Sequence, residues 1–238
     1  MRDILSIPFN GVEDLIIACD NSGSIGMKEH DLVHVPYETT AYYSFRVAVM
    51  ECIAAGGEPI SVVLHNFCGN EPWNLLVRGV QEGLNELSFL DVSITGSTES
   101  NFSLLQSALG LVVLGKKSTE RTTEIPYSDD LKFAVVGKPL VGAEVIEQKD
   151  QVAPLSIFHE ISKVNDVMLW PVGSKGILYE LNQMFSKKEF SQEMVVTNVK
   201  LLTSAGPSTC FIMVYQPVQE ETLKRIAGEL FHSLQIKK

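Results

Sequence analysis

The sequence has few cysteines, and their spacing does not suit metal binding. The four thiols lie far apart in the 238-residue chain, and most of them lie in apolar stretches. No Cys-x-x-Cys pair and no Cys/His pair with zinc-ligand spacing occurs, so we expect no structural zinc site. Reduced, mostly buried thiols are typical of a cytoplasmic protein. The four are Cys19, Cys52, Cys68 and Cys210.

Long apolar runs and an excess of positive charge are also lacking. No uninterrupted apolar stretch approaches the ~18 residues of a membrane span, and the first residues lack the apolar core of a secretory signal. The chain has 29 acidic and 19 basic residues, a formal net charge of −10. We therefore expect no nucleic-acid partner and no anionic membrane partner, because both require a basic face. An acidic protein can still bind nucleotide phosphates where Mg²⁺ or local amides neutralise them.

The sequence does contain the composition and segment order of a compact α/β (α+β) protein. Apolar residues make up 45% of the chain and charged residues 20%, which excludes disorder. Short β-branched runs alternate with helical periodicities on both sides of the polar stretch 115–130. This pattern predicts two domains, residues 1–115 and residues 116–238.

Hydrophobic periodicity predicts the elements of each half. In the first half it predicts strands over 15–19, 61–64, 92–95 and 109–114, and helices over 39–55 and 73–87. In the second half it predicts strands over 132–136, 167–170, 194–202 and 209–215, and helices over 152–163, 177–185 and 223–234.

The segment after the first predicted strand has the residue types of an anion-binding loop. Asp20 ends that strand and opens the sequence DNSGSIG, which closes on Lys28. Glycines permit close approach of a ligand, and amides and hydroxyls can face anionic oxygens. A carboxylate at a strand end also suits Mg²⁺. The alternative is an Asx turn or a helix cap. The common nucleotide fingerprints GxxxxGK[ST] and GxGxxG are absent.

Two further acids stand out by their surroundings. Glu51 lies in the most apolar predicted helix, where a charge is costly unless it is paired or metal-bound. A metal and a buried structural ion pair both remain open, although Arg46 lies too far around the helix to be an ideal partner. Glu99 follows a small polar loop after a strand, and an ordinary turn is the alternative there.

The remaining candidates are less specific. His65 follows a buried strand and is expected either in the core or lining a site. The sequence GSKG, residues 173–176, precedes a predicted helix, so it is expected either to bind an anion or to cap the helix. Asp31 is a further metal or substrate candidate, and Asn66 and Lys175 are candidates for an acceptor pocket.

Four stretches resemble the superfamily of aminoimidazole ribonucleotide synthetase, thiamine-monophosphate kinase, selenophosphate synthetase and the formylglycinamidine synthetases. In that superfamily an acid precedes a glycine-rich turn ending in Gly-x-Lys, which matches Asp20 and Lys28. A second acid stands five residues before Gly-Ala-x-Pro, where this chain has Glu51 in place of the usual Asp. The family's loop acid falls at Thr98, one residue before Glu99. The stretches are IIACDNSGSIGMK (16–28), AVMECIAAGGEPI (48–60), GVQEGLNEL (79–87) and ITGSTESNFSLLQSALGLVVLG (94–115).

The resemblance implies an N-terminal ATP- and Mg²⁺-binding domain that forms a homodimer through its sheet, and a ferredoxin-like C-terminal domain. It also implies a nucleotide cleft shared between subunits. The implied catalytic residues are Asp20 and Lys28, and the implied Mg²⁺ ligands are Asp20, Glu51 and Glu99. The implied ATP-binding residues are Asn21, Ser22, Gly23, Gly26, Lys28, Gly96, Ser97 and Thr98.

The activity that the resemblance implies is an ATP-dependent kinase acting on a hydroxyl of a small nucleoside-like molecule. Among the short members of the superfamily, this chain most resembles alpha-ribazole kinase of cobalamin salvage. Two alternatives remain open. One is a synthetase that forms a phosphorylated intermediate. The other is a non-catalytic nucleotide-binding module, which Thr98 at the family's acid position favours.

Overall fold

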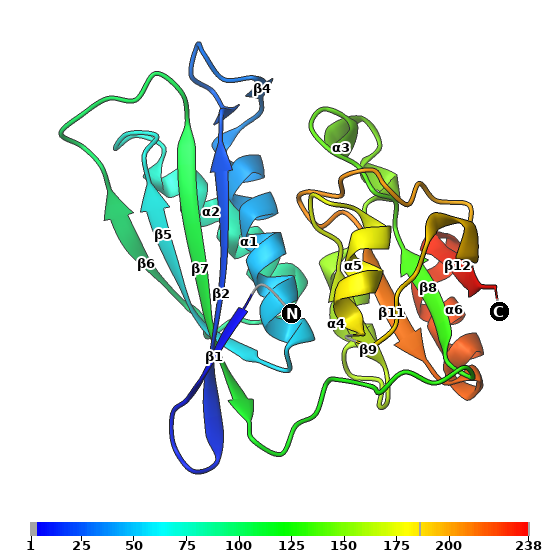
Figure 1. Ribbon diagram of the computed structural model, residues 1–238. Helices are drawn as coiled ribbons and strands as arrows, with labels where there is room; N and C mark the ends of the chain where they lie inside the picture. The colour runs from blue at the N-terminus through cyan, green and yellow to red at the C-terminus, as the bar shows by residue number, and fades with distance from the viewer. Residues whose placement is uncertain (1–3, 186, 238) are drawn as a thin grey trace. The chain divides into compact units, whose positions relative to one another are not determined.

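The computed structural model describes residues 4–185 and 187–237, which form two compact units (Figure 1). The first unit extends to residue 121 and the second begins at residue 122. Each unit has its own sheet and its own helices, so the protein is a mixed α/β structure. No helix of the described residues is long and apolar enough to cross a membrane.

The first unit is built on a five-stranded sheet. β5 and β6 pair in parallel, and the other neighbouring strands are antiparallel. In spatial order the strands are β1 (Ile4–Pro8), β2 (Glu13–Gly23), β7 (Ala108–Ser118), β5 (Glu58–Asn66) and β6 (Ser93–Thr98). The unit also contains α1 (Tyr37–Ala54), α2 (Trp73–Glu86) and the paired short strands β3 (Ile25–Gly26) and β4 (Val33–His34).

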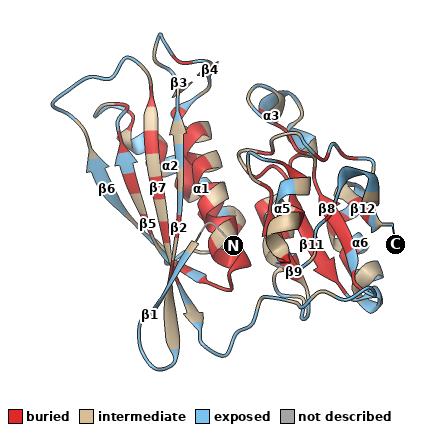
Figure 2. Ribbon diagram, viewed as in Figure 1, coloured by how far each residue is buried: buried red, intermediate tan, exposed pale blue. Residues whose placement is uncertain are grey.

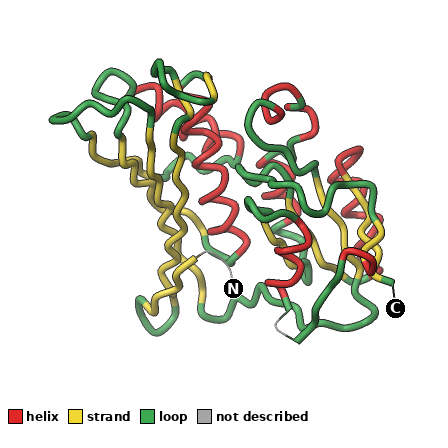
Figure 3. The backbone as a smooth tube through the Cα atoms, turned by 45° about the horizontal axis from the view of Figure 1, so that its top comes forward, coloured by secondary structure: helices red, strands yellow, loops and turns green. Residues whose placement is uncertain are grey.

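The two long helices of the first unit, α1 and α2, lie on the same side of this sheet. α1 packs on β2 and β7, and α2 packs on α1 (Figures 1 and 3). Burial alternates along the strands, because successive side chains point to opposite faces (Figure 2). Ile16 and Ala18 of β2, with Leu111 and Val113 of β7, form the covered face. The opposite face, here called the open face, carries Leu5, Ile7, Leu15, Ile17, Cys19, Asn21, Val63, His65, Thr95, Ser97, Gly110, Val112 and Leu114.

The predicted helix over 39–55 is confirmed as α1, and its end has a clear cause. Gly56 has φ +89°, a left-handed conformation that glycine adopts without strain. Gly57 lies so close to Cys52 that a Cβ on it would be 2.8 Å from the Cys52 Sγ. Both glycines are therefore required where the chain turns from α1 into β5.

The second unit is also built on a five-stranded sheet, and all its strand pairs are antiparallel. In spatial order its strands are β10 (Val195–Val196), β12 (Phe231–Ile236), β8 (Lys132–Val136), β11 (Phe211–Tyr215) and β9 (Met168–Pro171). Its helices are α3 (Glu144–Glu147), α4 (Leu155–Ile161), α5 (Ile177–Met184) and α6 (Glu220–Ala227).

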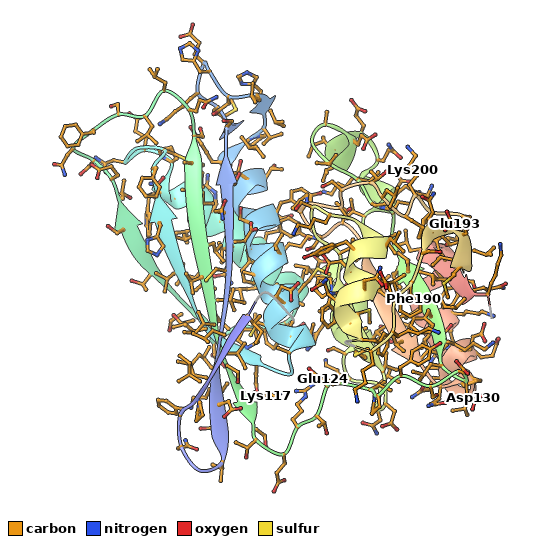
Figure 4. All side chains as sticks on the ribbon, viewed as in Figure 1. Lys117, Glu124, Asp130, Phe190, Glu193 and Lys200 are labelled. Carbon is orange, nitrogen blue, oxygen red and sulfur yellow. The ribbon has the colours of Figure 1, made fainter. Side chains whose placement is uncertain are left out.

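α4 and α5 pack on opposite faces of this second sheet. On the α4 face, Phe158 meets Phe211 edge to face, with 4.9 Å between ring centroids. On the α5 face, Leu181 packs among side chains of β8 and β11. Phe190 (labelled in Figure 4) closes the core there, with Phe185 at 6.3 Å between ring centroids. The unit therefore has a hydrophobic layer on each face of its sheet.

Two predicted elements of the second half were wrong. The helix expected over 223–234 ends at Ala227, because Gly228 turns the chain with φ +57°. Gly228–Leu230 form a short 3₁₀ helix, and the residues after it form β12, in which His232 and Leu234 are buried and Ser233 between them is exposed. The strand expected over 194–202 is reduced to the two residues of β10.

Candidate functional site

The predicted glycine-rich loop after Asp20 is in fact the end of strand β2. β2 continues to Gly23, which pairs with Ala108, because β7 provides backbone partners along the whole length of β2. Because successive side chains of a strand point to opposite faces of the sheet, residues that are neighbours in the sequence lie on different faces. Asp20 and Ser22 lie on the covered face, and Asn21 lies on the open face.

The predicted loop Gly96–Thr98 likewise belongs to strand β6. Gly96 and Thr98 pair with buried residues of β5 and lie on the covered face, whereas Ser97 pairs with His65 on the open face. A Cβ on Gly96 would be 2.1 Å from the Leu64 carbonyl oxygen, so the strand pairing itself requires this glycine. The Thr98 hydroxyl accepts a hydrogen bond from the buried Asn66 amide at 3.0 Å. The side chain of Asn66 therefore helps to hold the end of β6.

Asp20 is a partly buried acid that faces α1. Burial raises its pKa to about 6, although hydrogen bonds from the Asn21 N–H and the Ser44 hydroxyl oppose this shift. Ser44 is only 2% exposed and belongs to α1. A carboxylate that titrates near neutral pH suits a proton acceptor or a cation ligand. The structure therefore gives Asp20 the strongest chemical signature of the predicted site residues.

Lys28 connects three loops through its ammonium group. Its Nζ donates to the carbonyl oxygens of Phe67 at 3.2 Å, Leu104 at 2.9 Å and Gln106 at 3.3 Å. An ammonium has three N–H donors, so these carbonyls can use its full capacity. Lys28 therefore holds the ends of the strands around it in place, and its role toward phosphates stays a prediction.

Asp31 is a structural acid within the same group of loops. Its carboxylate accepts hydrogen bonds from the Ser107 N–H and hydroxyl, both at 2.7 Å, and from the Lys28 N–H at 2.8 Å. Burial alone would raise the pKa of Asp31, but these hydrogen bonds hold it below its usual value. A Cβ on Gly26 would be 2.5 Å from the Ser107 Oγ, so Gly26 is required for this packing. Sequence reasoning missed Ser107, whose partner Asp31 lies 76 residues away.

The three predicted Mg²⁺ ligands do not form a metal-binding group within the described residues. Glu99 is engaged in its own turn, where its Oε1 accepts from the N–H groups of Asn101 at 2.7 Å and Phe102 at 3.2 Å. Glu51 is half-buried on α1 and has an interaction partner. Nowhere in residues 4–185 and 187–237 do three His, Cys, Asp or Glu side chains form a group that could hold a metal ion. Their convergence in a dimer stays a prediction.

On the open face, four residues from four strands stand side by side. Asn21 of β2 is opposite Gly110 of β7, Gly110 is opposite His65 of β5, and His65 is opposite Ser97 of β6. We call these four residues the polar row. Asn21, His65 and Ser97 are all exposed, so His65 is no core residue. Two of the predicted ATP-binding residues, Asn21 and Ser97, are thus brought together with His65.

The candidates of the second unit have local roles. The Gly173 N–H donates to the Glu180 Oε1 at 3.4 Å, and the Trp170 Nε1 donates to the other oxygen of Glu180 at 2.9 Å. The Lys175 ammonium lies 3.2 Å from the Tyr179 hydroxyl and 4.3 Å from the centre of its ring. These contacts organise the start of α5.

Comparisons by sequence gave no relatives. No family model matches the chain, and no curated protein matches it. Solved structures do match. PurL from Thermotoga maritima complexed with ATP has a TM-score of 0.62 and 11% identity, covering 98% of this chain and 42% of that chain. Thiamine-monophosphate kinase from Stenotrophomonas maltophilia has a TM-score of 0.59 and 14% identity, covering 99% of this chain and 89% of the kinase.

A third match is a HypE–HypF complex, with a TM-score of 0.56 and 12% identity over 98% of this chain. The chain spans less than half the length of the PurL chains that it matches. At these identities the likeness shows the fold. This chain therefore has the fold shared by PurL, thiamine-monophosphate kinase and HypE.

Proposed function

We propose that the protein is an ATP- and Mg²⁺-dependent enzyme that transfers a phosphoryl group to the hydroxyl of a small nucleoside-like molecule. The observation that carries this proposal is the fold, which over nearly the whole chain is that of PurL complexed with ATP and of a kinase. Phosphoryl transfer depends mainly on placement and on charge neutralisation, which a few well-placed side chains can provide.

The residues around Asp20 fit such a nucleotide. Asp20 and Ser22 follow each other on the covered face of β2, and both offer oxygen atoms of the kind that Mg²⁺ prefers. Mg²⁺-ATP would supply the γ-phosphoryl group. With its pKa raised to about 6, Asp20 would hold the cation or accept the proton of the acceptor hydroxyl. Lys28 would act by positioning, because its ammonium holds three loop carbonyls.

We propose Glu51 and Glu99 as the remaining Mg²⁺ ligands, contributed across a dimer. The support for a dimer is the open face, where Leu5 is 56% and Ile7 39% exposed beside the apolar Ile17 and Leu114. Apolar surface of this kind is stabilised by burial against a partner. We further propose that the second unit is a ferredoxin-like domain, supported by its two β-α-β segments and the strand order β12-β8-β11-β9.

For the acceptor we propose alpha-ribazole, converted to alpha-ribazole phosphate. This choice rests on the sequence resemblance described above. A synthetase that forms a phosphorylated intermediate is the alternative that the PurL structures suggest.

A non-catalytic nucleotide-binding module is favoured by a separate observation. Lys28 and Glu99 already satisfy backbone groups, and no group of three metal-ligating side chains occurs in the part of the chain that the structure describes. Such a module would bind Mg²⁺-ATP and leave it intact.

The test is ADP release from Mg²⁺-ATP with a panel of acceptors. The panel contains alpha-ribazole, other nucleosides, and formylglycinamide ribonucleotide with an ammonia source. We expect turnover with a nucleoside and its loss in Asp20→Asn. Asp14→Asn is the matched control, because Asp14 lies on the same strand and its carboxylate accepts a hydrogen bond from the exposed Ser6 hydroxyl at 3.3 Å. Thermal stabilisation by Mg²⁺-ATP without turnover supports the module, and no response to Mg²⁺-ATP refutes the proposal.

A further inference from the structure

Exposed apolar side chains gather where three segments of the first unit meet. These segments follow β2, β5 and β6, at the end of the sheet where the three strands finish (Figure 1). Met27 is 61% exposed, Leu105 is 74% exposed, and Phe67 and Leu104 are each 39% exposed. We call these four residues the apolar tip. Soluble proteins seldom expose several large apolar side chains together unless something binds there. The three segments are 24–36, 67–72 and 99–107.

Hydrogen bonds hold the backbone of the apolar tip in one place. The Lys28 ammonium of the first segment donates to the carbonyl oxygens of Phe67 at 3.2 Å and of Leu104 at 2.9 Å. The Gln106 side-chain amide donates to the carbonyl oxygen of His30 at 2.7 Å. These bonds join all three segments, so the apolar side chains project from one common framework. A surface that is ordered in advance loses little conformational entropy when a partner binds.

The charges around the apolar tip are mainly negative. The three segments contain four acidic residues, and Lys28 is their one lysine or arginine. The Lys28 ammonium has three N–H donors, and three loop carbonyls can use them all. Of the acids, Glu29 and Glu71 are exposed, so the rim of the apolar tip is negative. The four acids are Glu29, Asp31, Glu71 and Glu99.

This combination of charge and exposure distinguishes between three kinds of partner. A second copy of the chain would bring two negative rims together, which opposes docking through this surface. An anionic membrane would be repelled in the same way. A protein segment with apolar side chains and flanking lysines or arginines would cover the apolar centre and pair with the rim, which is the usual anatomy of a protein interface. The observations therefore favour a basic protein segment.

We propose that the apolar tip is the docking site of a partner protein, which contributes an apolar segment flanked by lysine or arginine. The inference goes beyond the proposed function and does not depend on it, because it uses only the exposure, the fixed backbone and the charge of the three segments. None of the four residues of the apolar tip is among those proposed to bind the nucleotide or Mg²⁺.

The test measures the binding of three labelled model peptides by fluorescence anisotropy. The first is a helix-forming peptide of leucine and lysine, about 18 residues long, with the leucines on one face. The second has glutamate in place of lysine, and the third has serine in place of leucine. We expect the leucine–lysine peptide to bind, and the other two to bind at least tenfold more weakly.

Variants of the protein locate the binding. Met27→Ser and Leu105→Ser should each weaken binding of the leucine–lysine peptide at least tenfold, and both should fold, because each replaces an exposed side chain. Leu90→Ser is the matched control, because Leu90 is 75% exposed and lies outside the three segments. Glu71→Lys should also weaken binding, because it reverses one charge of the rim.

The proposal is overturned if Met27→Ser and Leu105→Ser both bind the leucine–lysine peptide within twofold of the unchanged protein. Equal binding of the leucine–glutamate peptide would also overturn it, because the charge of the rim would then select nothing. A lower molar mass of Leu105→Ser in light scattering would make the apolar tip a contact between copies instead. Sedimentation with phosphatidylcholine vesicles that Leu105→Ser abolishes would make it a membrane contact instead. None of these measurements depends on ATP turnover, so this inference and the proposed function can fail separately.

Discussion

Asp20 has a raised pKa, which is common at functional sites, and its ionisation lowers the stability of the folded protein. Its pKa of about 6 in the folded protein lies above the value of 3.8 expected in the unfolded chain. The unfolded state therefore loses this proton first as pH rises, and stability falls between pH 3.8 and pH 6 and stays lower above that range. Acids kept at such a cost are common at functional sites.

We therefore predict that Asp20→Asn stabilises the protein while it removes the proposed activity. At pH 7.5 the gain should be about 1–2 kcal/mol, less than the full shift implies because Asp20 is partly exposed. At pH 4 most of the gain should be lost, because the native carboxyl is then protonated and the carboxyl of the unfolded chain is partly protonated. Urea denaturation at both pH values measures this difference. An equal or lower stability of the variant at pH 7.5 would contradict the prediction.

His232 is a buried residue with the opposite pH dependence. It is 7% exposed, and within the described residues neither ring nitrogen has a hydrogen-bond partner. Burial, aided by the charge of Lys138, lowers the pKa of His232 below 6.5. As pH falls below 6.5, the unfolded chain takes up a proton that the folded protein resists, so stability is lost.

We predict that His232→Leu reduces the loss of stability between pH 7 and pH 5. Leucine fits the buried positions of β12, where Leu234 already lies. The measurement is the free energy of unfolding of both proteins at several pH values, with His34→Leu as the exposed control. Parallel pH curves for the two proteins would show that His232 does not titrate in this range.

Elements whose signal lies in their own sequence were predicted well. The strand over 132–136 is confirmed with both ends, and the helices over 73–87 and 177–185 are each confirmed to within one residue. The hydrophobic periodicity of these elements, and the residues that mark their ends, lie within the elements themselves or directly beside them. The predicted helix over 223–234 was wrong after residue 227, because residues 231–236 also alternate as a strand does, with His232 and Leu234 buried. Only the conformation of Gly228 and the pairing with β8 decide between them.

The candidate site could also be predicted only in part, because part of it depends on contacts between distant residues. The sequence identified Asp20, Asn21 and Ser97 as candidates, but it could not assign them to faces, because the faces depend on how far β2 and β6 extend. Ser107 and Gly110 were missed. The first depends on a partner 76 residues away, and the second interrupts an apolar run without any local reason.

At the element scale, Gly228 separates α6 from β12. We predict that Gly228→Ala lowers stability by ~1–2 kcal/mol, because its φ of +57° with ψ −134° strains any other residue. No atom lies within 4 Å of a Cβ at this position, so the loss reflects backbone strain alone. Chemical denaturation measures it, and Gly110→Ala, which has no such φ, should not be destabilised. Equal effects at both positions would refute this account.

At the scale of the whole molecule, the proposed dimer would form through the open face, where Leu5 and Ile7 are exposed. We predict that Ile17→Asp converts a dimer into a monomer, because a charge placed beside Leu5 and Leu114 opposes burial. Light scattering after gel filtration measures the mass. Leu90→Asp is the control, since Leu90 is 75% exposed and lies outside the sheet. A dimer that survives Ile17→Asp would exclude this face as its interface.

The three carbonyl oxygens around the Lys28 ammonium have a consequence for the ionic requirements of the protein. Gathered main-chain oxygens are the coordination that free potassium or ammonium ions find in many proteins. Here the cation is the Lys28 ammonium, which is part of the chain, so these loops are ordered without binding a dissolved ion. Exchanging potassium for sodium in the medium should leave these loops unaffected. Replacing Lys28 by methionine would create a demand for an external monovalent cation.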